Sequence, residues 1–219
     1  MKYQALIFDL DGTLLDTLDD LADSVNVVLS ANGYPTKTRD EVCRAVGDGM
    51  KKLIERVLPA GVCLSDTEFD RILNEFKAHY GAHCEDKTAP YAGIVELLEK
   101  LQHGGVKMAI VSNKADYAVK MLSKRWFSDT VPVAIGENEA AGIRKKPAPD
   151  TVDLALRELG VSRSEAAYVG DSEVDVQTAD NCSMPCLSVT WGFRDRAYLV
   201  ERGATELFDT PEALWNAVR

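Results

Sequence analysis

The stretch Leu6-Ile7-Phe8-Asp9-Leu10-Asp11-Gly12-Thr13-Leu14-Leu15-Asp16 decides how the rest of the chain is organised. Tyr3 to Phe8 is a short, mostly apolar run with the length of one fully buried strand. It ends on two acidic residues, and Gly12 then permits a sharp turn. Open parallel sheets bind ligands at the carboxyl ends of their strands, so Asp9 and Asp11 stand where chemistry is expected.

The two carboxylates of this stretch favour a divalent cation. Carboxylates so close together repel each other, and a cation between them relieves the repulsion. The pair suits Mg²⁺, a hard ion that prefers oxygen ligands, and it allows one carboxylate to act as nucleophile and the other as general acid and base. A solvated turn has the same Asp-x-Asp-Gly letters. A calcium-binding EF-hand loop is excluded, because Asp20 stands where that loop needs its closing Glu.

The composition is that of an ordinary globular protein, with 219 residues, 46% hydrophobic and 27% charged. A net charge of −10 argues against a nucleic-acid partner, which would require basic patches. Five cysteines are scattered without a C-x-x-C pair, as is typical of a reducing compartment. Neither a signal-peptide pattern nor an apolar run of about 18 residues occurs, so we expect a cytoplasmic protein without a membrane partner. Nothing in the sequence predicts its oligomeric state.

The hydrophobic pattern divides the chain into a helical segment and an α/β segment. Residues 16–84 carry helical stripes only, the first of them over Leu18–Ala31. After Pro90, short apolar runs alternate with amphipathic helices, which predicts a parallel sheet covered on both faces. We therefore expect an α/β fold, with a Rossmann-like core of residues 1–15 and 85–219. The helical segment would be a cap inserted after the first strand, acting as a lid that excludes water and contacts substrate.

Four predicted strands end on residues that phosphoryl chemistry needs. The strand 3–8 leads to Asp9 and Asp11, the strand 106–111 to Ser112 and Asn113, the run 131–135 to Lys145 and Lys146, and the strand 166–169 to Asp171 and Asp175. Hydroxyl and amide groups can bond phosphoryl oxygens, and lysines can neutralise a carboxylate and developing charge. Each segment alone has an ordinary alternative as a turn, a helix cap or a solvated charge. Because the ends of parallel strands meet at one edge of a sheet, their joint occurrence indicates a single site.

These segments resemble the motifs of the haloacid dehalogenase superfamily, and the resemblance covers nearly the whole chain. The four matching segments are Asp9-Leu10-Asp11-Gly12-Thr13, Val111-Ser112-Asn113-Lys114, Lys146-Pro147-Ala148-Pro149 and Gly170-Asp171-Ser172-Glu173-Val174-Asp175. The helical insertion, with Val46-Gly47-Asp48-Gly49-Met50, and the segment Thr190-Trp191-Gly192-Phe193 are similar to the phosphoglycolate phosphatase-like branch. Cys182-Ser183-Met184 departs from the Ala-Gly-Met common there, so we expect local backbone strain in this turn.

The resemblance implies an Mg²⁺-dependent phosphatase with an aspartyl-phosphate intermediate. By this resemblance, Asp9 attacks phosphorus, and Asp11 protonates the leaving alcohol and then activates water. Ser112 and Lys146 would hold the phosphoryl oxygens, Pro147 favouring Lys146 over Lys145. The implied Mg²⁺ ligands are the Asp9 carboxylate, the Asp11 backbone carbonyl and Asp171, with Asp175 either a ligand or directly behind the ligands. The expected substrate contacts are Thr13, Asn113, Gly47, Asp48 and Lys51.

Several substrates and two other activities stay open. Asp11 favours phosphate esters over dehalogenation, because a departing alcohol needs a proton and a halide does not. The expected substrate is 2-phosphoglycolate, with sugar phosphates, nucleoside monophosphates and pyrophosphate as competitors. A β-phosphoglucomutase-like phosphotransferase would share the same core residues. A non-enzymatic phospho-aspartate regulatory module would need neither a helical lid nor Asp11.

Overall fold

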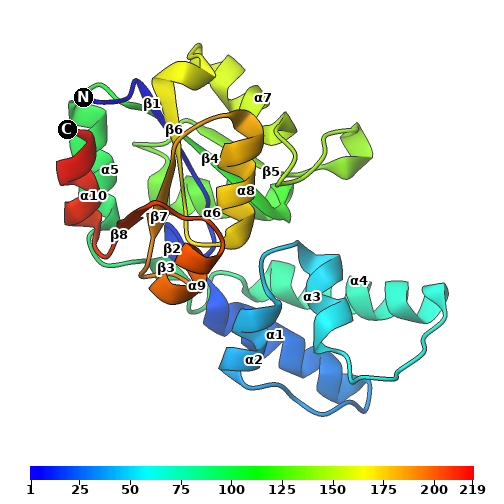
Figure 1. The fold of residues 1–219 in the computed structure, drawn as a ribbon. Helices are drawn as coiled ribbons and strands as arrows, with labels where there is room; N and C mark the ends of the chain where they lie inside the picture. Colours follow the sequence, from blue (N-terminus) through cyan, green and yellow to red (C-terminus); the bar gives the residue numbers. More distant parts are fainter. The chain divides into compact units, whose positions relative to one another are not determined.

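The computed structural model describes all 219 residues, and the chain divides into two compact units (Figure 1). The core unit comprises Met1–Asp16 and Pro90–Arg219, and the helical unit comprises Thr17–Ala89. The helical unit extends beyond the expected boundary at residue 84, because the Asp20 carboxylate accepts hydrogen bonds from the backbone N–H groups of Lys87 (3.0 and 3.1 Å) and Thr88 (2.9 Å). The short strands β2 (Leu15–Asp16) and β3 (Ala89–Pro90) form a two-stranded sheet.

The core unit is built on a six-stranded parallel sheet in the order β5-β4-β1-β6-β7-β8. These strands are β1 (Ala5–Phe8), β4 (Lys107–Ala115), β5 (Val133–Glu137), β6 (Ala166–Gly170), β7 (Cys186–Val189) and β8 (Glu206–Phe208). Phe8, the last residue of β1, is paired with Ile110 on one side and Val169 on the other. The carboxyl ends of β1, β4 and β6 therefore lie together at one edge, and the predicted α/β fold is confirmed.

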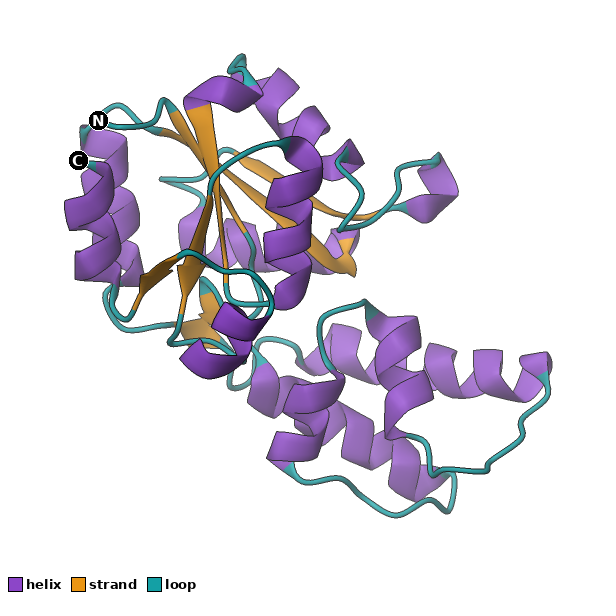
Figure 2. Ribbon diagram, viewed as in Figure 1, coloured by secondary structure: helices purple, strands orange, loops and turns teal.

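Helices cover both faces of this sheet, as Figure 2 shows. They are α5 (Ile94–His103), α6 (Asp116–Phe127), α7 (Asp150–Leu159), α8 (Glu173–Cys182), α9 (Arg196–Glu201) and α10 (Pro211–Val218), with short 3-10 turns at Glu139–Ala141 and Arg163–Glu165. Leu6 and Phe8 pack in the apolar cluster with α5, α6 and α10, whereas Ala5 and Ile7 pack in the cluster with α7 and α8. Side chains of β1 alternate between the faces, and each large one contributes about 1.5–3 kcal/mol on full burial. This double burial makes β1 a rigid support for the residues that follow it.

The helical unit consists of α1 (Leu18–Ala31), α2 (Arg39–Ala45), α3 (Met50–Val57) and α4 (Asp66–His83). Capping boxes begin two of its helices, with Thr38 before α2 and Ser65 before α4, and each satisfies backbone donors that the first turn leaves free. Phe76 and Tyr80 stack inside the unit with ring centroids 5.7 Å apart. Across the whole chain, no helix is both long enough and apolar enough to cross a membrane.

Four strands of the core unit differ from the sequence prediction by two residues or more, and the first of them, β1, begins at Ala5 instead of Tyr3. The strand expected to end at Val111 continues through Ser112 and Asn113 to the end of β4, with a register shift that lets it pair with β5 again at Ala115. The strand β5 begins two residues later than predicted, because Pro132 has no N–H for the ladder. The strand β8 was not predicted, since its three residues are only half-buried at the sheet edge.

Ser183, in the turn predicted to be strained, is the one non-glycine residue with a positive φ. It caps the carboxyl end of α8 at φ 54° and ψ 42°, and its N–H donates to the Asp180 carbonyl at 2.9 Å. A side chain in this left-handed region costs roughly 1–2 kcal/mol, which glycine avoids.

Ser183→Gly is therefore expected to stabilise the protein by about 0.5–1 kcal/mol, since the relief of strain exceeds the extra unfolded-state entropy of glycine. Thermal unfolding should show a midpoint about 1–3 °C higher. Ser183→Ala keeps the Cβ atom and serves as the control without stabilisation. An unchanged or lower midpoint for Ser183→Gly would mean that the Ser183 backbone is not strained.

Candidate active site

The loop after β1 holds Asp9 in a fixed position at the sheet edge. The Asp9 N–H donates to the Val169 carbonyl of β6 at 2.9 Å, and the Leu10 N–H donates to the Asp9 Oδ1 atom at 2.7 Å. The chain then turns sharply, with Gly12 at φ 85° and its N–H donating to the Leu15 carbonyl at 2.9 Å. Asp9 is left only 8% exposed, with its carboxylate at the edge of the sheet.

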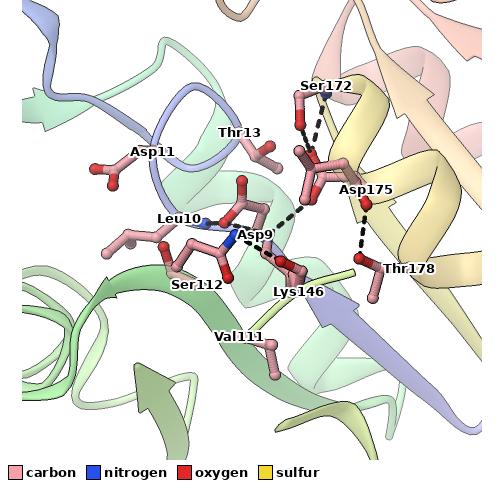
Figure 3. A network of polar contacts seen from close by, with 12 residues as sticks. Asp9, Leu10, Asp11, Thr13, Val111, Ser112, Lys146, Ser172, Asp175 and Thr178 are labelled. Atoms are coloured by element: carbon pink, nitrogen blue, oxygen red, sulfur yellow. Dashed lines mark hydrogen bonds and ion pairs between the residues drawn. The ribbon is translucent and has the colours of Figure 1, made fainter. Parts of the chain in front are cut away.

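Lys146 uses all three of its N–H donors on protein acceptors. Its Nζ atom lies 2.9 Å from Asp9 Oδ1, 2.7 Å from Asp175 Oδ1 and 2.9 Å from the Tyr168 hydroxyl. Figure 3 shows Asp9, Lys146 and Asp175 as neighbours in this network. Because an ammonium group has three donors, the arrangement saturates Lys146, which is 2% exposed. Lys146 therefore neutralises and orients the Asp9 carboxylate; a contact with phosphoryl oxygens stays a prediction.

Burial dominates the electrostatics of the cluster. It raises the pKa of Asp9 to about 7, an effect that Lys146 opposes and Asp175 reinforces. Burial also raises the pKa of Asp171 well above its usual range, with Asp175 and Asp9 adding to the effect. Burial alone would lower the pKa of Lys146, but Asp175 and Asp9 outweigh it and hold that pKa well above its ordinary value. The negative charge of Asp9, Asp171 and Asp175 thus exceeds the positive charge of Lys146, and a bound cation would compensate the difference.

Asp171, directly after β6, is fixed from two sides. The Thr13 hydroxyl donates to its Oδ1 atom at 2.9 Å, and the Phe193 N–H donates to its Oδ2 atom at 2.7 Å. A Cβ atom at Gly12 or at Gly192 would collide with the Asp171 side chain. Both glycines are therefore required by close approach to Asp171. Thr13, expected to contact substrate, supports Asp171 through its hydroxyl.

The donor set fits a hard divalent cation. Asp9, Asp171 and Asp175 are all buried, and one carboxylate oxygen from each lies within 4.8 Å of the others. Asp175 is further engaged, because its Oδ2 atom accepts from the N–H (3.0 Å) and the hydroxyl (2.6 Å) of Ser172 while its Oδ1 atom faces Lys146. Carboxylate oxygens are suitable ligands for Mg²⁺. The Asp11 carbonyl stays a predicted ligand.

Lys114 is a residue of the site that the sequence reasoning missed. Its Nζ atom lies 2.7 and 2.9 Å from the two carboxylate oxygens of Asp11, and its side chain is 3% exposed. It comes from β4, the neighbour of β1. Local spacing did not reveal it, because the strand was expected to end at Val111 and the register shift that follows breaks the regular alternation of side chains.

Ser112 and Asn113 are both buried at the end of β4. The Ser112 hydroxyl accepts from the Lys114 N–H at 3.3 Å, and the Asn113 side-chain amide donates to the Lys146 carbonyl at 3.0 Å. Asn113 therefore holds the backbone that carries Lys146. Contacts of Ser112 and Asn113 with substrate stay predictions.

The other expected substrate contacts, Gly47, Asp48 and Lys51, belong to the helical unit. Asp48 forms an ion pair with Arg56, and the Lys51 Nζ atom lies 6.0 Å from the centre of the Phe69 ring. These contacts occupy the two charged groups within their own unit. Their role toward substrate stays a prediction.

Comparisons with known proteins show what this chain is similar to. Residues 6–189 match the family model described as haloacid dehalogenase-like hydrolase. Among curated relatives, a phosphoglycolate phosphatase of Agrobacterium fabrum is 33% identical over 195 residues, which are 86% of this chain and 81% of the relative. One of Psychrobacter arcticus is 31% identical over 220 residues, covering 98% of this chain and 95% of the relative. The matched segment contains every residue of the carboxylate and lysine cluster described above.

Solved structures give the same result for the fold. The crystal structure of a provisionally named phosphoglycolate phosphatase from Lactobacillus delbrueckii subsp. bulgaricus has a TM-score of 0.92 and 38% identity, covering 100% of this chain and 99% of the other. A provisionally named phosphoglycolate phosphatase from Haemophilus somnus has a TM-score of 0.90 at 24% identity, covering 100% of this chain and 99% of the other, and shares the fold.

Proposed function

Because the chain belongs to the haloacid dehalogenase-like hydrolase family and is a phosphoric monoester hydrolase, we propose that it is an Mg²⁺-dependent phosphatase whose substrate is 2-phosphoglycolate. The observation that carries this proposal is the buried Asp9 carboxylate, held by Lys146 and close to Asp171 at the carboxyl edge of the sheet. Lys146 orients the Asp9 nucleophile, and acidic ligands for a metal ion lie beside it. This arrangement suits phosphoryl transfer, which depends mainly on positioning and charge neutralisation.

The reaction proceeds in two displacements at phosphorus. An Asp9 carboxylate oxygen forms a bond to phosphorus while the bond to the ester oxygen breaks, and Asp11 gives its proton to the leaving alcohol. Asp11, now a carboxylate, takes a proton from water as that water attacks the aspartyl-phosphate and releases inorganic phosphate and free Asp9. Lys146 keeps the Asp9 oxygen directed at phosphorus through both steps, and Ser112 donates to a phosphoryl oxygen.

The metal would be held by carboxylate oxygens of Asp9 and Asp171 and by the Asp11 carbonyl. Asp175 would stand behind these ligands, because its oxygens already accept from Lys146 and Ser172. When bound, Mg²⁺ supplies neutralising charge to the phosphoryl oxygens. Thr13 would orient Asp171 in this arrangement.

Removal of the metal is expected to stop turnover. Excess EDTA should lower phosphate release at least about 100-fold, since the phosphoryl charge and the repulsion among the buried carboxylates would go uncompensated. Addition of Mg²⁺ beyond the chelator should restore the rate, and protein carried through the same dialysis without EDTA is the control. Undiminished turnover in EDTA would overturn the site assignment.

The substrate is tested by ranking kcat/KM over phosphorylated metabolites. We expect 2-phosphoglycolate to rank above sugar phosphates, nucleoside monophosphates and pyrophosphate, as the names of the relatives suggest. Variants at Gly47, Asp48 and Lys51 should change this ranking if these residues contact the leaving group. A phosphotransferase would return phosphate to a sugar, and a regulatory module would release at most one phosphate per protein.

A further inference from the structure

We propose that Lys114 is a positioning residue for the reaction, which holds the Asp11 carboxylate in the direction needed for proton transfer. The inference rests on the proposed function, because it assigns Lys114 a role through the acid and base of that chemistry. Lys114 itself is not required to touch the substrate.

The contact between the two residues is close and nearly dry. The Lys114 ammonium lies 2.7 and 2.9 Å from the two carboxylate oxygens of Asp11 and donates hydrogen bonds to both of them. The Lys114 side chain is 3% exposed and that of Asp11 is 15% exposed. A lysine is rarely buried to this degree unless it is paired, because its desolvation is costly. The pairing with Asp11 therefore accounts for a lysine at this place.

The backbone on both sides of the pair is fixed, so the ion pair decides where the carboxylate points. Asp11 forms a β-bridge with Leu15, and the Gly12 N–H donates to the Leu15 carbonyl at 2.9 Å. Lys114 lies within β4, directly before Ala115, which pairs with Glu137 of β5. With both main chains held, the Asp11 side-chain torsions are the remaining freedom, and Lys114 restricts them.

The other buried lysine of the site cannot take over this task. The three donors of Lys146 are occupied by Asp9, Asp175 and Tyr168. The two lysines therefore have different roles. Lys146 orients the nucleophile Asp9, and Lys114 orients Asp11, the general acid and base. Without Lys114, the partly exposed Asp11 carboxylate would turn between rotamers and toward water, so both proton transfers would start from fewer productive geometries.

The test compares Lys114→Met and Lys114→Arg on two substrates of different leaving group. On 2-phosphoglycolate, whose alkoxide needs a proton, Lys114→Met should lower kcat about 10- to 100-fold with little change in KM, and Lys114→Arg should retain most of the rate. On p-nitrophenyl phosphate, the leaving phenolate departs without a proton. In Lys114→Met, formation of the aspartyl-phosphate should then be nearly as fast as in the wild type, and its hydrolysis by water should be slow. The result is a burst of about one p-nitrophenol per protein.

A double-mutant cycle with Asp11→Asn separates positioning from direct action on the substrate. If Lys114 acts through Asp11, Lys114→Met should cause no further loss in the Asp11→Asn background. Multiplicative losses, or a change confined to KM, would overturn the proposal. Lys114→Met alone leaves the Asp11 carboxylate buried without its cation and could unfold the protein. The double variant removes both charges, so it can still be compared with Asp11→Asn if Lys114→Met does not fold. A wild-type protein that hydrolyses no phosphomonoester would refute the proposed function instead.

Discussion

Asp9→Asn is expected to abolish phosphatase turnover, with a loss on the order of 10⁴-fold or more. The amide cannot form the bond to phosphorus, so the covalent intermediate is lost and only the binding of the ester remains. The fold should persist, because the oxygen of the new side-chain amide can still accept from the Leu10 N–H that now donates to Asp9 at 2.7 Å. The substitution also removes a carboxylate whose pKa burial raises to about 7, and so relieves a cost of the folded state.

The measurement is phosphate release at saturating Mg²⁺, together with trapping of the phosphorylated protein after an acid quench. After reaction with substrate that carries a labelled phosphate, wild-type protein should retain a label that hydroxylamine releases. Asp9→Asn should retain none. Asp180→Asn, an exposed position on α8, is the matched control with wild-type activity. Label that persists in Asp9→Asn would assign the nucleophile to a different residue.

Lys146→Met is expected to cost both activity and stability, the second large effect. Removing the ammonium leaves Asp9 and Asp175 buried at 8% and 0% exposure without their shared cation, a change that typically costs about 3–5 kcal/mol. The Asp9 carboxylate also loses the group that orients it, so kcat should fall about 10²- to 10³-fold.

Lys145→Met is the matched control, because Lys145 is the adjacent lysine and is more exposed than Lys146. Urea unfolding of both variants should show a lower midpoint for Lys146→Met only, and steady-state kinetics should show the loss of kcat in the same variant. Equal effects of the two substitutions would mean that the contacts of Lys146 with Asp9 and Asp175 do not govern the site.

The segments whose local chemistry is strong were predictable. The alternation of apolar runs with amphipathic helices predicted the parallel sheet, and the first helix was expected over the residues that α1 occupies. Asp9 and Asp171 could be placed at one edge because the ends of parallel strands must meet there. The short strand β8 was not predicted, since three half-buried residues at a sheet edge show too little periodicity to be distinguished from a loop.

The partners of each side chain were not predictable. Lys114 reads as a solvated lysine until β4 is extended beyond Val111 and brought beside β1, which buries it against Asp11. Likewise, Lys146 was expected to neutralise a carboxylate and to hold phosphoryl oxygens, but the sequence did not tell which acceptors its three donors meet. They lie in β6, in α8 and on the residue after β1. Contacts of this kind join residues far apart in the chain, so no local pattern records them.

The sequence by itself determined the order of elements, the strand that carries Asp9 and the acidic character of the site, because these follow from periodicity and from residue type along one stretch of chain. Only the tertiary structure decided which cation serves which carboxylate and which glycines must lack a Cβ atom beside Asp171. The physical reason is that burial and pairing are properties of the assembled sheet edge, where desolvation and a few ångströms of separation set the charge balance.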